Sequence, residues 1–266
     1  MNARAKYIAR SRAIGSLLCV GLDTRAADVP EPFRAAEQPQ FAFNRWLIDQ
    51  THPYAAAYKI NTAFYEARGA QGWAELEQTI AYLREAHPAA LTICDAKRGD
   101  IGSTSGAYAE AVFDHLGFDC VTLNPYLGRD ALLPFLERAD KGCILLCRTS
   151  NAGSGEFQAL LVEGEPLWLR VARQVAEQWD ARGNCMLVVG ATYPREIAAV
   201  RAIAPAMPLL IPGIGAQGGD LEATVRAGMD TDGGGMIISV SRGIAGADDP
   251  GAAAAAFRDA IRGVVR

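Results

Sequence analysis

The stretch LTICDAKRGDI, residues 91–101, joins a short apolar run to a cluster of charged residues. Residues 91–94 lack the alternation of polar and apolar positions that a half-exposed strand has, which indicates a buried parallel strand. Asp95 and Lys97 follow two residues apart, so if the strand pitch persists their side chains point the same way. We therefore expect a carboxylate and an ammonium side by side at the carboxyl end of a buried strand, where parallel α/β folds bind ligands.

Seven further apolar runs of strand length accompany this one: residues 17–22, 54–60, 120–123, 142–147, 186–191, 208–211 and 236–240. Segments with apolar residues at helical spacing lie between them. These predicted helices cover residues 41–51, 73–86, 103–116, 130–139, 167–180, 196–203, a stretch beginning near Leu221, and 252–265. The segment 152–166 is rich in glycine and long for a connection, which indicates either a functional flap or a mobile insertion.

Eight strands alternating with helices predict a (β/α)8 TIM barrel. Residues 3–14 predict a leading helix that ends at Gly15. With 266 residues the chain is close to the roughly 250 residues of one such barrel, so we expect a single domain over 1–266. A doubly wound open sheet is the alternative, but the count of eight and the lack of an early G-x-G-x-x-G motif favour the barrel.

Two other predicted strands also end in charged residues. Asp23 follows the first strand, where its carboxylate either binds a hydroxylated ligand or caps a helix or turn. Lys59 ends a very apolar run, which favours a functional role somewhat over a side chain whose ammonium reaches out to solvent.

The loops after the seventh and eighth strands predict a phosphate site. PGIGAQGGD, residues 212–220, contains four glycines and leads into a helix, so the backbone at Gly213 and Gly215 can approach an anion closely. Gln217 offers an amide donor, and Arg242 in SRGI, residues 241–244, can bind the same anion with two hydrogen bonds. A pair of ordinary tight turns is the alternative, but this placement is the common phosphate site of barrels.

Composition limits the partners and the compartment. The formal net charge of -4 argues against general binding of nucleic acid or of an anionic membrane. Six cysteines without C-x-x-C pairs or metal-ligand spacing are typical of buried thiols in a reducing compartment. Because no signal-peptide pattern or membrane-length apolar run is present, we expect a cytoplasmic protein.

Four of these features together resemble the orotidine 5′-phosphate decarboxylase family. They are DAKRGDI at 95–101, Lys59, PGIGAQGGD at 212–220 and SRG at 241–243. The resemblance covers residues 17 to about 244, and D-x-K-x-x-D-[IV] followed by P-G-[IV]-G-x-Q-G-G-D is highly specific as a pair. The stretches DAKRGDIGST, NPYLGRD and RTSN resemble the longer bacterial branch of that family.

The resemblance implies decarboxylation of orotidine 5′-monophosphate to uridine 5′-monophosphate in pyrimidine synthesis, without cofactor or metal. Its implied catalytic residues are an alternating array of Lys59, Asp95, Lys97 and Asp100. Its implied substrate contacts are Asp23 and Thr104 to the ribose, Ile101 and Ser150 to the pyrimidine, and Gly213, Gly215, Gln217 and Arg242 to the phosphate. It also implies a homodimer in which Asp100 and Thr104 reach the neighbouring site.

The decarboxylation needs charged residues of the kind that this array supplies. Loss of CO2 from C6 leaves a carbanion with little resonance stabilisation, so the enzyme must place charge in advance. We expect Lys97 to stabilise the carbanion and to protonate C6, and Asp95 to lie near the departing carboxylate. Repulsion of the ground state is a contested mechanism, so the electrostatic role of Lys97 carries more weight. Lys59 and Asp100 would hold these two residues, because unpaired buried charges cost several kcal/mol each.

Two alternatives stay open. Phosphosugar enzymes of the same barrel type, such as 3-keto-L-gulonate 6-phosphate decarboxylase or hexulose-phosphate synthase, also carry D-x-K-x-x-D but bind magnesium, partly through a glutamate near the end of the second strand. Lys59 takes that place here, and a lysine cannot replace a carboxylate ligand. A non-catalytic barrel that binds a phosphate ligand would have the same fold, although the complete set of four charged residues argues against it.

Overall fold

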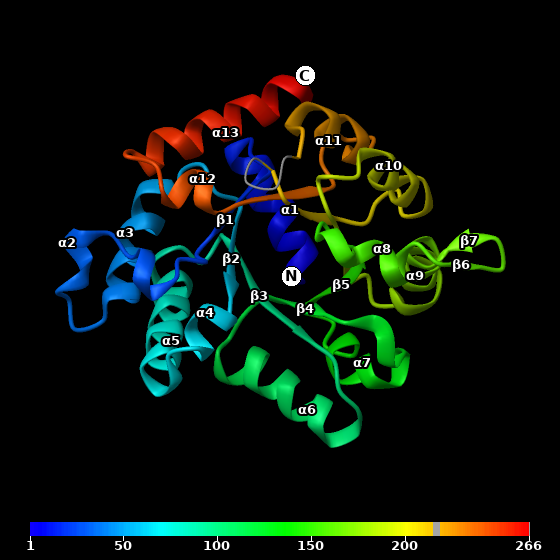
Figure 1. Ribbon diagram of the computed structural model, residues 1–266, viewed down its shortest axis with the longest axis horizontal. Helices are drawn as coiled ribbons and strands as arrows, with labels where there is room; N and C mark the ends of the chain where they lie inside the picture. Colours follow the sequence, from blue (N-terminus) through cyan, green and yellow to red (C-terminus); the bar gives the residue numbers. More distant parts are fainter. Residues whose placement is uncertain (215–218, 266) are drawn as a thin grey trace.

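The computed structural model describes residues 1–214 and 219–265 (Figure 1). Eight parallel strands close into a barrel in the order β1-β10-β9-β8-β5-β4-β3-β2. They are β1 (Leu18–Gly21), β2 (Ala57–Asn61), β3 (Leu91–Arg98), β4 (Cys120–Leu123), β5 (Gly142–Arg148), β8 (Cys185–Val189), β9 (Leu209–Pro212) and β10 (Met236–Val240). Pairing of Leu18 with Ile238 closes the ring, so the (β/α)8 prediction is confirmed and the open sheet is excluded.

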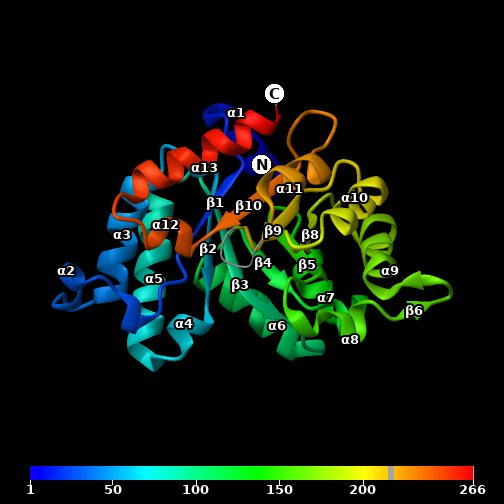
Figure 2. The same ribbon diagram turned by 45° about the horizontal axis from the view of Figure 1, so that its top comes forward.

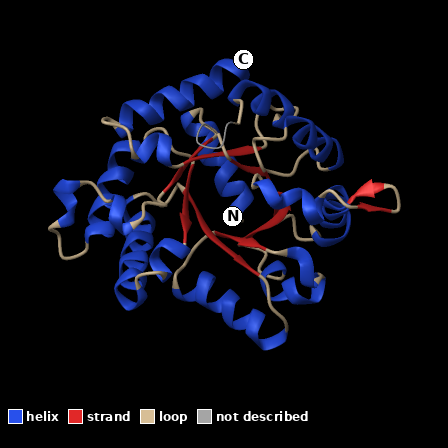
Figure 3. Ribbon diagram, in the orientation of Figure 1, coloured by secondary structure: helices blue, strands red, loops and turns tan. Residues whose placement is uncertain are grey.

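A ring of helices surrounds the strands (Figure 3). Its main members are α3 (Pro39–Thr51), α5 (Gly69–Ala86), α6 (Gly102–Glu110), α7 (Arg129–Leu136), α9 (Leu167–Gln174), α10 (Pro194–Ile203), α11 (Leu221–Gly228) and α13 (Pro250–Val265). Each predicted helix is present, with ends that differ by a few residues.

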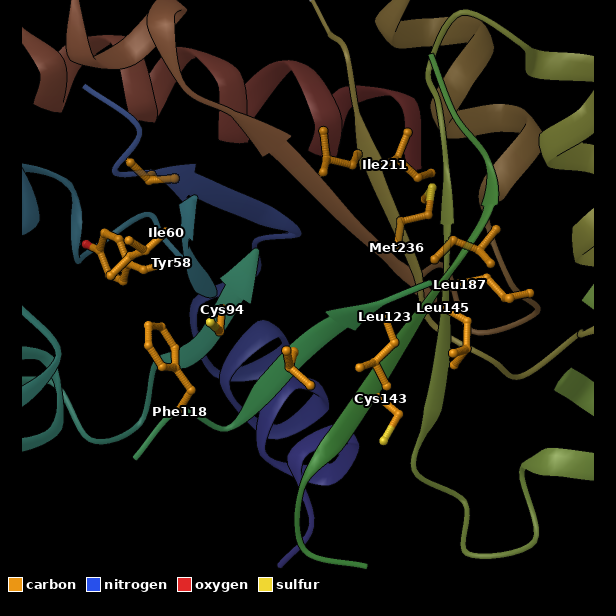
Figure 4. Packing of buried hydrophobic residues seen from close by; sticks show 14 of the residues in the cluster. Tyr58, Ile60, Cys94, Phe118, Leu123, Cys143, Leu145, Leu187, Ile211 and Met236 are labelled. Atoms are coloured by element: carbon orange, nitrogen blue, oxygen red, sulfur yellow. The ribbon is translucent and has the colours of Figure 1, made fainter. Parts of the chain in front are cut away.

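The strands bury residues on both faces, as a parallel barrel requires. Outward-facing side chains such as Tyr58, Ile60 and Leu145 form a layer between strands and helices (Figure 4). Ala57 and Ile93 belong to a separate inner cluster. Because side chains alternate along β2, Lys59 faces the inside of the barrel with Ala57. The sheet therefore directs this lysine into the barrel.

Helix α1 (Ala3–Ile14) covers the amino-terminal end of the barrel, which confirms the predicted leading helix. Ala3 and Tyr7 are buried in the inner cluster, and the hydroxyl of Tyr7 donates to the carbonyl of Met236. In Figure 2 the strands run from the side of α1 towards the opposite end, where the loops after them gather. The carboxyl ends of the strands therefore form the open end of the barrel.

Several local predictions need correction. Strand β3 continues to Arg98 rather than ending at Cys94, and the segment after β5 contains α8 (Gly155–Gln158) and an antiparallel hairpin of β6 (Leu161–Val162) and β7 (Glu165–Pro166). Besides α8, three further single-turn helices were not predicted: α2 (Glu31–Arg34), α4 (Ala63–Glu66) and α12 (Arg242–Ala245). Elements this short depend on tertiary packing, because one helical turn has no stability or periodicity of its own.

Two predicted helices end differently from a regular α-helix. The chain after α6 and after α9 forms π-helical turns, Ala111–His115 and Val175–Trp179. None of the helices in the described part of the chain has the combination of length and hydropathy that crossing a membrane requires.

Candidate active site

Charged side chains from three neighbouring strands converge at the open end of the barrel. Lys59 on β2 lies opposite Gly21 on β1 and Ile93 on β3, and Asn61 lies opposite Asp95. Asp23 follows β1 by two residues. This register brings the carboxylates of Asp23 and Asp95 to either side of the lysine.

Lys59 is the buried centre of this cluster. The residue is only 6% exposed, and its Nζ lies 2.9 Å from Oδ2 of Asp23 and 3.1 Å from Oδ2 of Asp95. The interpretation that its ammonium reaches out to solvent is therefore wrong. Burial by itself disfavours the ammonium, but the two carboxylates outweigh it and raise the pKa of Lys59 above its ordinary value.

Asp95 accepts hydrogen bonds from two lysines and a threonine. Its Oδ2 faces Lys59, while its Oδ1 accepts from Nζ of Lys97 at 2.7 Å and from Oγ1 of Thr122 at 3.0 Å. Burial raises the pKa of this carboxyl, but the two ammonium groups reverse that effect and hold the pKa of Asp95 well below its ordinary value. Asp95 is therefore ionised at neutral pH.

Lys97 contacts Asp95 as expected, but the reason given from the sequence is wrong. The strand pitch does not persist, because the pairing of β3 with β4 shifts between Cys94 and Arg98, and Lys97 adopts a left-handed conformation with φ of 49°. This bulge places the two side chains together, and the side chain of Lys97 is 49% exposed. One side of its ammonium is held by Asp95 while the rest is open to the mouth of the barrel.

Asp23 bonds across strands rather than capping a turn. Its Oδ2 accepts from Nζ of Lys59 and also from Oγ of Ser241 at 2.7 Å. Its Oδ1 accepts from the backbone N–H of Asn61 at 2.8 Å. The hydroxyl of Ser241 comes so close to β1 that a Cβ at Gly21 would lie 1.8 Å from it. Glycine is therefore required at position 21 for β1 and the end of β10 to meet around Asp23.

The turn between β3 and α6 does not join this cluster. Oδ1 of Asp100 accepts from the backbone N–H of Ile101 at 2.8 Å, and within the described residues no lysine or arginine pairs with Asp100. Ile101 is 61% exposed, and Thr104 is also exposed on the first turn of α6. A single chain therefore brings together Lys59, Asp95 and Lys97 but not Asp100.

The candidate phosphate-binding residues follow β9 and β10, at the same end of the barrel as the charged cluster. Gly213 follows β9 with φ of 105°, and Ile214 and Gly219 form an isolated bridge. Gly215 and Gln217 lie outside the described residues. Arg242 is exposed at the start of α12, directly after the Ser241 that bonds Asp23.

Ser150 follows β5 at the same end. A Cβ added at Gly190, the residue after β8, would lie 2.7 Å from the Cβ of Ser150, so the ends of β5 and β8 approach closely. The structure thus places Ser150 and Arg242 at the end of the barrel that carries the charged cluster.

Sequence reasoning missed two hydroxyls, those of Thr122 and Ser241. Thr122 is a polar residue in the otherwise apolar and fully buried β4, and such a residue needs a hydrogen-bond partner. That was a usable signal for Thr122. Ser241 was noted only as part of a turn, and nothing in the sequence pairs it with Asp23, 218 residues away.

Comparison with known proteins agrees with the resemblance seen in the sequence. The profile described as "Orotidine 5'-phosphate decarboxylase / HUMPS family" matches residues 16–257. The chain is 51% identical over 242 residues to an orotidine 5′-phosphate decarboxylase of Azoarcus sp. (strain BH72), covering 90% of this chain and 89% of that protein. It is 48% identical over 231 residues to the same enzyme of Cellvibrio japonicus, covering 86% and 84%.

Solved structures show the same relationship. The OMP decarboxylase of Leishmania donovani superposes with a TM-score of 0.88 at 42% identity, covering 100% of this chain and 99% of that one. The orotidine 5′-phosphate decarboxylase of Pyrococcus horikoshii OT3 superposes with a TM-score of 0.69 at 27% identity, covering 93% and 100%. Sequence match, fold and motif positions lead to one assignment: this chain belongs to the orotidine 5′-phosphate decarboxylase / HUMPS family.

Proposed function

We propose that this protein is a carboxy-lyase that converts orotidine 5′-monophosphate to uridine 5′-monophosphate and CO2. The observation that carries the proposal is the ion pair of Asp95 and Lys97 at the barrel mouth, in which Asp95 also pairs with the buried Lys59. This arrangement suits a reaction in which negative charge moves from a carboxylate to a ring carbon, because the charges are fixed before the substrate arrives.

Lys97 is the group that meets the new negative charge. When the bond between C6 and the carboxylate breaks, its electron pair stays on C6 and neutral CO2 departs. The ammonium of Lys97 then transfers a proton to C6, and the resulting amine regains a proton from solvent. Its half-exposed position beside Asp95 leaves donor hydrogens free for this step.

Asp95 contributes by its fixed negative charge. Because both its oxygens are bonded to cations or to Thr122, the carboxylate cannot turn away from an incoming anionic substrate. The substrate carboxylate loses its charge when CO2 forms, so repulsion from Asp95 is relieved as the reaction proceeds. Lys59 holds Asp95 in place and Asp23 extends the network towards the ribose hydroxyls.

The phosphate of the substrate would be held by the loops after β9 and β10. Gly213 has a positive φ at the start of one loop, and Arg242, which is exposed, begins the helix after the other. Gly215 and Gln217 complete this proposed site. A phosphate bound far from C6 supplies binding energy that orients the ring against the charged cluster.

The reaction is proposed to need no metal or other cofactor. A magnesium ion would need carboxylate oxygens with free lone pairs, and here Lys59 occupies the space between Asp23 and Asp95 at 2.9 and 3.1 Å. The magnesium-dependent phosphosugar chemistry within the same family is therefore disfavoured by this lysine.

A homodimer is proposed to complete the site. Asp100 has no cation near it within the described part of its own chain, and Ile101 beside it is 61% exposed. Tyr126 and Leu127, which follow β4, are also exposed large apolar residues. Exposed apolar side chains around an acid that pairs with no cation among the described residues suit a subunit interface. Asp100 and Thr104 would reach the neighbouring site across this interface, and Ile101 and Ser150 would line the pyrimidine pocket.

The setting of the enzyme is proposed to be the cytoplasm, with residues 1–266 acting as one domain. All six cysteines are free and buried, and burial raises the pKa of thiols such as Cys19 and Cys94, each to about 12. Unreactive, unpaired thiols are typical of a reducing compartment.

The decisive test is an assay of the purified protein with orotidine 5′-monophosphate, followed by the loss of orotate-type ultraviolet absorbance. We expect turnover that is unchanged by EDTA. Absence of decarboxylation would refute the proposed activity, and decarboxylation that EDTA abolishes and magnesium restores would refute its proposed independence of metal.

A further inference from the structure

Thr122 on β4 contacts both charged residues of β3 that the proposed reaction uses. It is 1% exposed, and its Oγ1 lies 2.9 Å from the backbone nitrogen of Lys97 and 3.0 Å from Oδ1 of Asp95. An ionised carboxylate can only accept, so the hydroxyl donates its proton to Asp95 and accepts from the amide of Lys97. One hydroxyl therefore links the backbone of one charged residue to the side chain of the other.

The position of Thr122 in the sheet explains why it is available for this task. Cys94 pairs with Val121 and Arg98 pairs with Leu123, so β3 advances four residues while β4 advances two. Thr122 is the single β4 residue opposite residues 95–97. The N–H of Lys97 finds its acceptor in this side chain rather than in a carbonyl of β4.

The backbone that Thr122 supports is an unfavourable one. Among the described non-glycine residues only Lys97 and Glu163 have positive φ, and a left-handed conformation is uncommon for a residue with a Cβ. Residues held in this way persist only where the surroundings enforce them, and they cluster at functional sites. Without the hydroxyl, the amide of Lys97 would be left without its acceptor and the bulge could relax.

We propose that Thr122 is a positioning residue of the reaction, which holds the left-handed turn at Lys97 and orients Asp95 so that the ammonium lies at the mouth of the barrel. The inference rests on the proposed function, in which Lys97 acts at C6. Oδ1 of Asp95 also accepts from Nζ of Lys97 at 2.7 Å, so hydroxyl, carboxylate and ammonium form one closed network. Thr122 acts through Lys97 and Asp95 and not on the substrate.

The chain provides a matched control in Thr92. This residue is 2% exposed on β3, its hydroxyl donates to Oδ2 of Asp119 at 2.9 Å, and it accepts from the backbone N–H of Asp119 at 3.0 Å. The same hydroxyl chemistry therefore occurs near the other end of the barrel, away from Asp95 and Lys97.

The first test compares the kinetics of Thr122→Val, Thr122→Ser and Thr92→Val with orotidine 5′-monophosphate. We expect Thr122→Val to lower kcat by more than about tenfold while KM changes less than about threefold, because an interaction that matters in the transition state is weakened. Thr122→Ser should restore kcat to within about threefold of the wild type, and Thr92→Val should keep both constants within that range. A wild-type kcat in Thr122→Val would overturn the proposal.

A crystal structure of Thr122→Val separates this inference from the proposed function. If the wild type does not decarboxylate the nucleotide, the proposed function fails, but the positioning role is still judged by geometry. We expect Lys97 to leave the positive-φ region and its Nζ to move out of hydrogen-bond distance of Asp95. An unchanged turn and contact would overturn the inference, and Thr122→Ala carries the same expectations if the valine variant does not fold.

Discussion

At the scale of single residues, the buried lysine on β2 determines how the charges at the barrel mouth are arranged. The side chain of Lys59 is 7% exposed and is bonded to both Asp23 and Asp95. Buried ion pairs of this kind contribute little net stability when complete, but removing one member leaves the other charges buried without a partner. Lys59 therefore matters to the fold as well as to the site.

Replacing this lysine should be costly for stability. Lys59→Met keeps an unbranched apolar stem that is one atom shorter but leaves two carboxylates facing each other, so we expect a loss of about 3–5 kcal/mol in the free energy of unfolding. Chemical denaturation measures it. The matched control is Arg226→Met, which removes an exposed pair with Glu222 and should cost less than about 1 kcal/mol. Equal losses in the two variants would contradict the role given to Lys59.

The free energy of unfolding should depend on pH through the shifted pKa values of Asp95 and Lys59. The pKa of Asp95 is depressed in the folded protein, so its contribution is present above its ordinary unfolded pKa of about 3.9 and is lost as pH falls below that value. The pKa of Lys59 is raised, so its contribution is present below about pH 10.4 and is lost as pH rises through the folded value. We expect denaturation curves to show a loss of stability on acidification that is smaller in Lys59→Met; an equal acid dependence in both proteins would contradict this.

At the scale of elements, the sequence was most informative where hydrophobic runs are long. All eight barrel strands could be predicted, because continuous burial leaves a clear apolar pattern, and the leading helix could be predicted because Gly15 marks its end. The bulge in β3 could not, since it depends on how β3 pairs with β4, which is a long-range property. The bond between Ser241 and Asp23 was hidden for the same reason.

The candidate site divides in a similar way. Charges at strand ends were predictable because the barrel brings those ends together, and Asp23, Lys59, Asp95 and Lys97 do converge. Asp100 was grouped with them by motif alone, and its place in one chain is apart from them. Motif spacing does not distinguish residues that act in their own subunit from residues that act in a neighbour.

The short helix α12 and the loop after β9 should bind the phosphate. We expect Arg242→Ala to lower kcat/KM for orotidine 5′-monophosphate. The loss of transition-state stabilisation should be about 2–5 kcal/mol, by analogy with truncation of a charge partner. The control is the nucleoside orotidine, which lacks the phosphate and should react equally slowly with both proteins. A change smaller than tenfold with the nucleotide would contradict the phosphate role.

At the scale of the whole molecule, the barrel is closed at one end and open at the other. Helix α1 covers the amino-terminal end, and the charged cluster lies at the carboxyl end. Ile101 follows Asp100 directly in the sequence and is 61% exposed. Tyr126 follows β4, the strand that pairs with β3, and is 85% exposed at the same open end. A second copy covering this surface would place its own Asp100 against the site.

Mixing two inactive variants tests this sharing of residues. If Asp100 acts across the interface, a heterodimer of Lys97→Ala and Asp100→Ala has one fully intact site and one site with both changes. Random reassembly should then restore about a quarter of wild-type activity, because half the dimers are mixed and each has one working site. Each variant dissociated and reassembled alone is the control. No recovery, with mixed dimers verified by mass, would show that Asp100 acts within its own chain.

The most direct measurement is a crystal structure of the protein with an unreactive uridine 5′-monophosphate analogue that carries an anionic oxygen on C6. If the ammonium of Lys97 meets the charge that develops on C6, its Nζ should lie about 2.7–3.2 Å from that oxygen, with Asp95 still bonded behind it. A Lys97 side chain that points away from the ring, or a metal ion bound among Asp23, Lys59 and Asp95, would contradict the proposed mechanism.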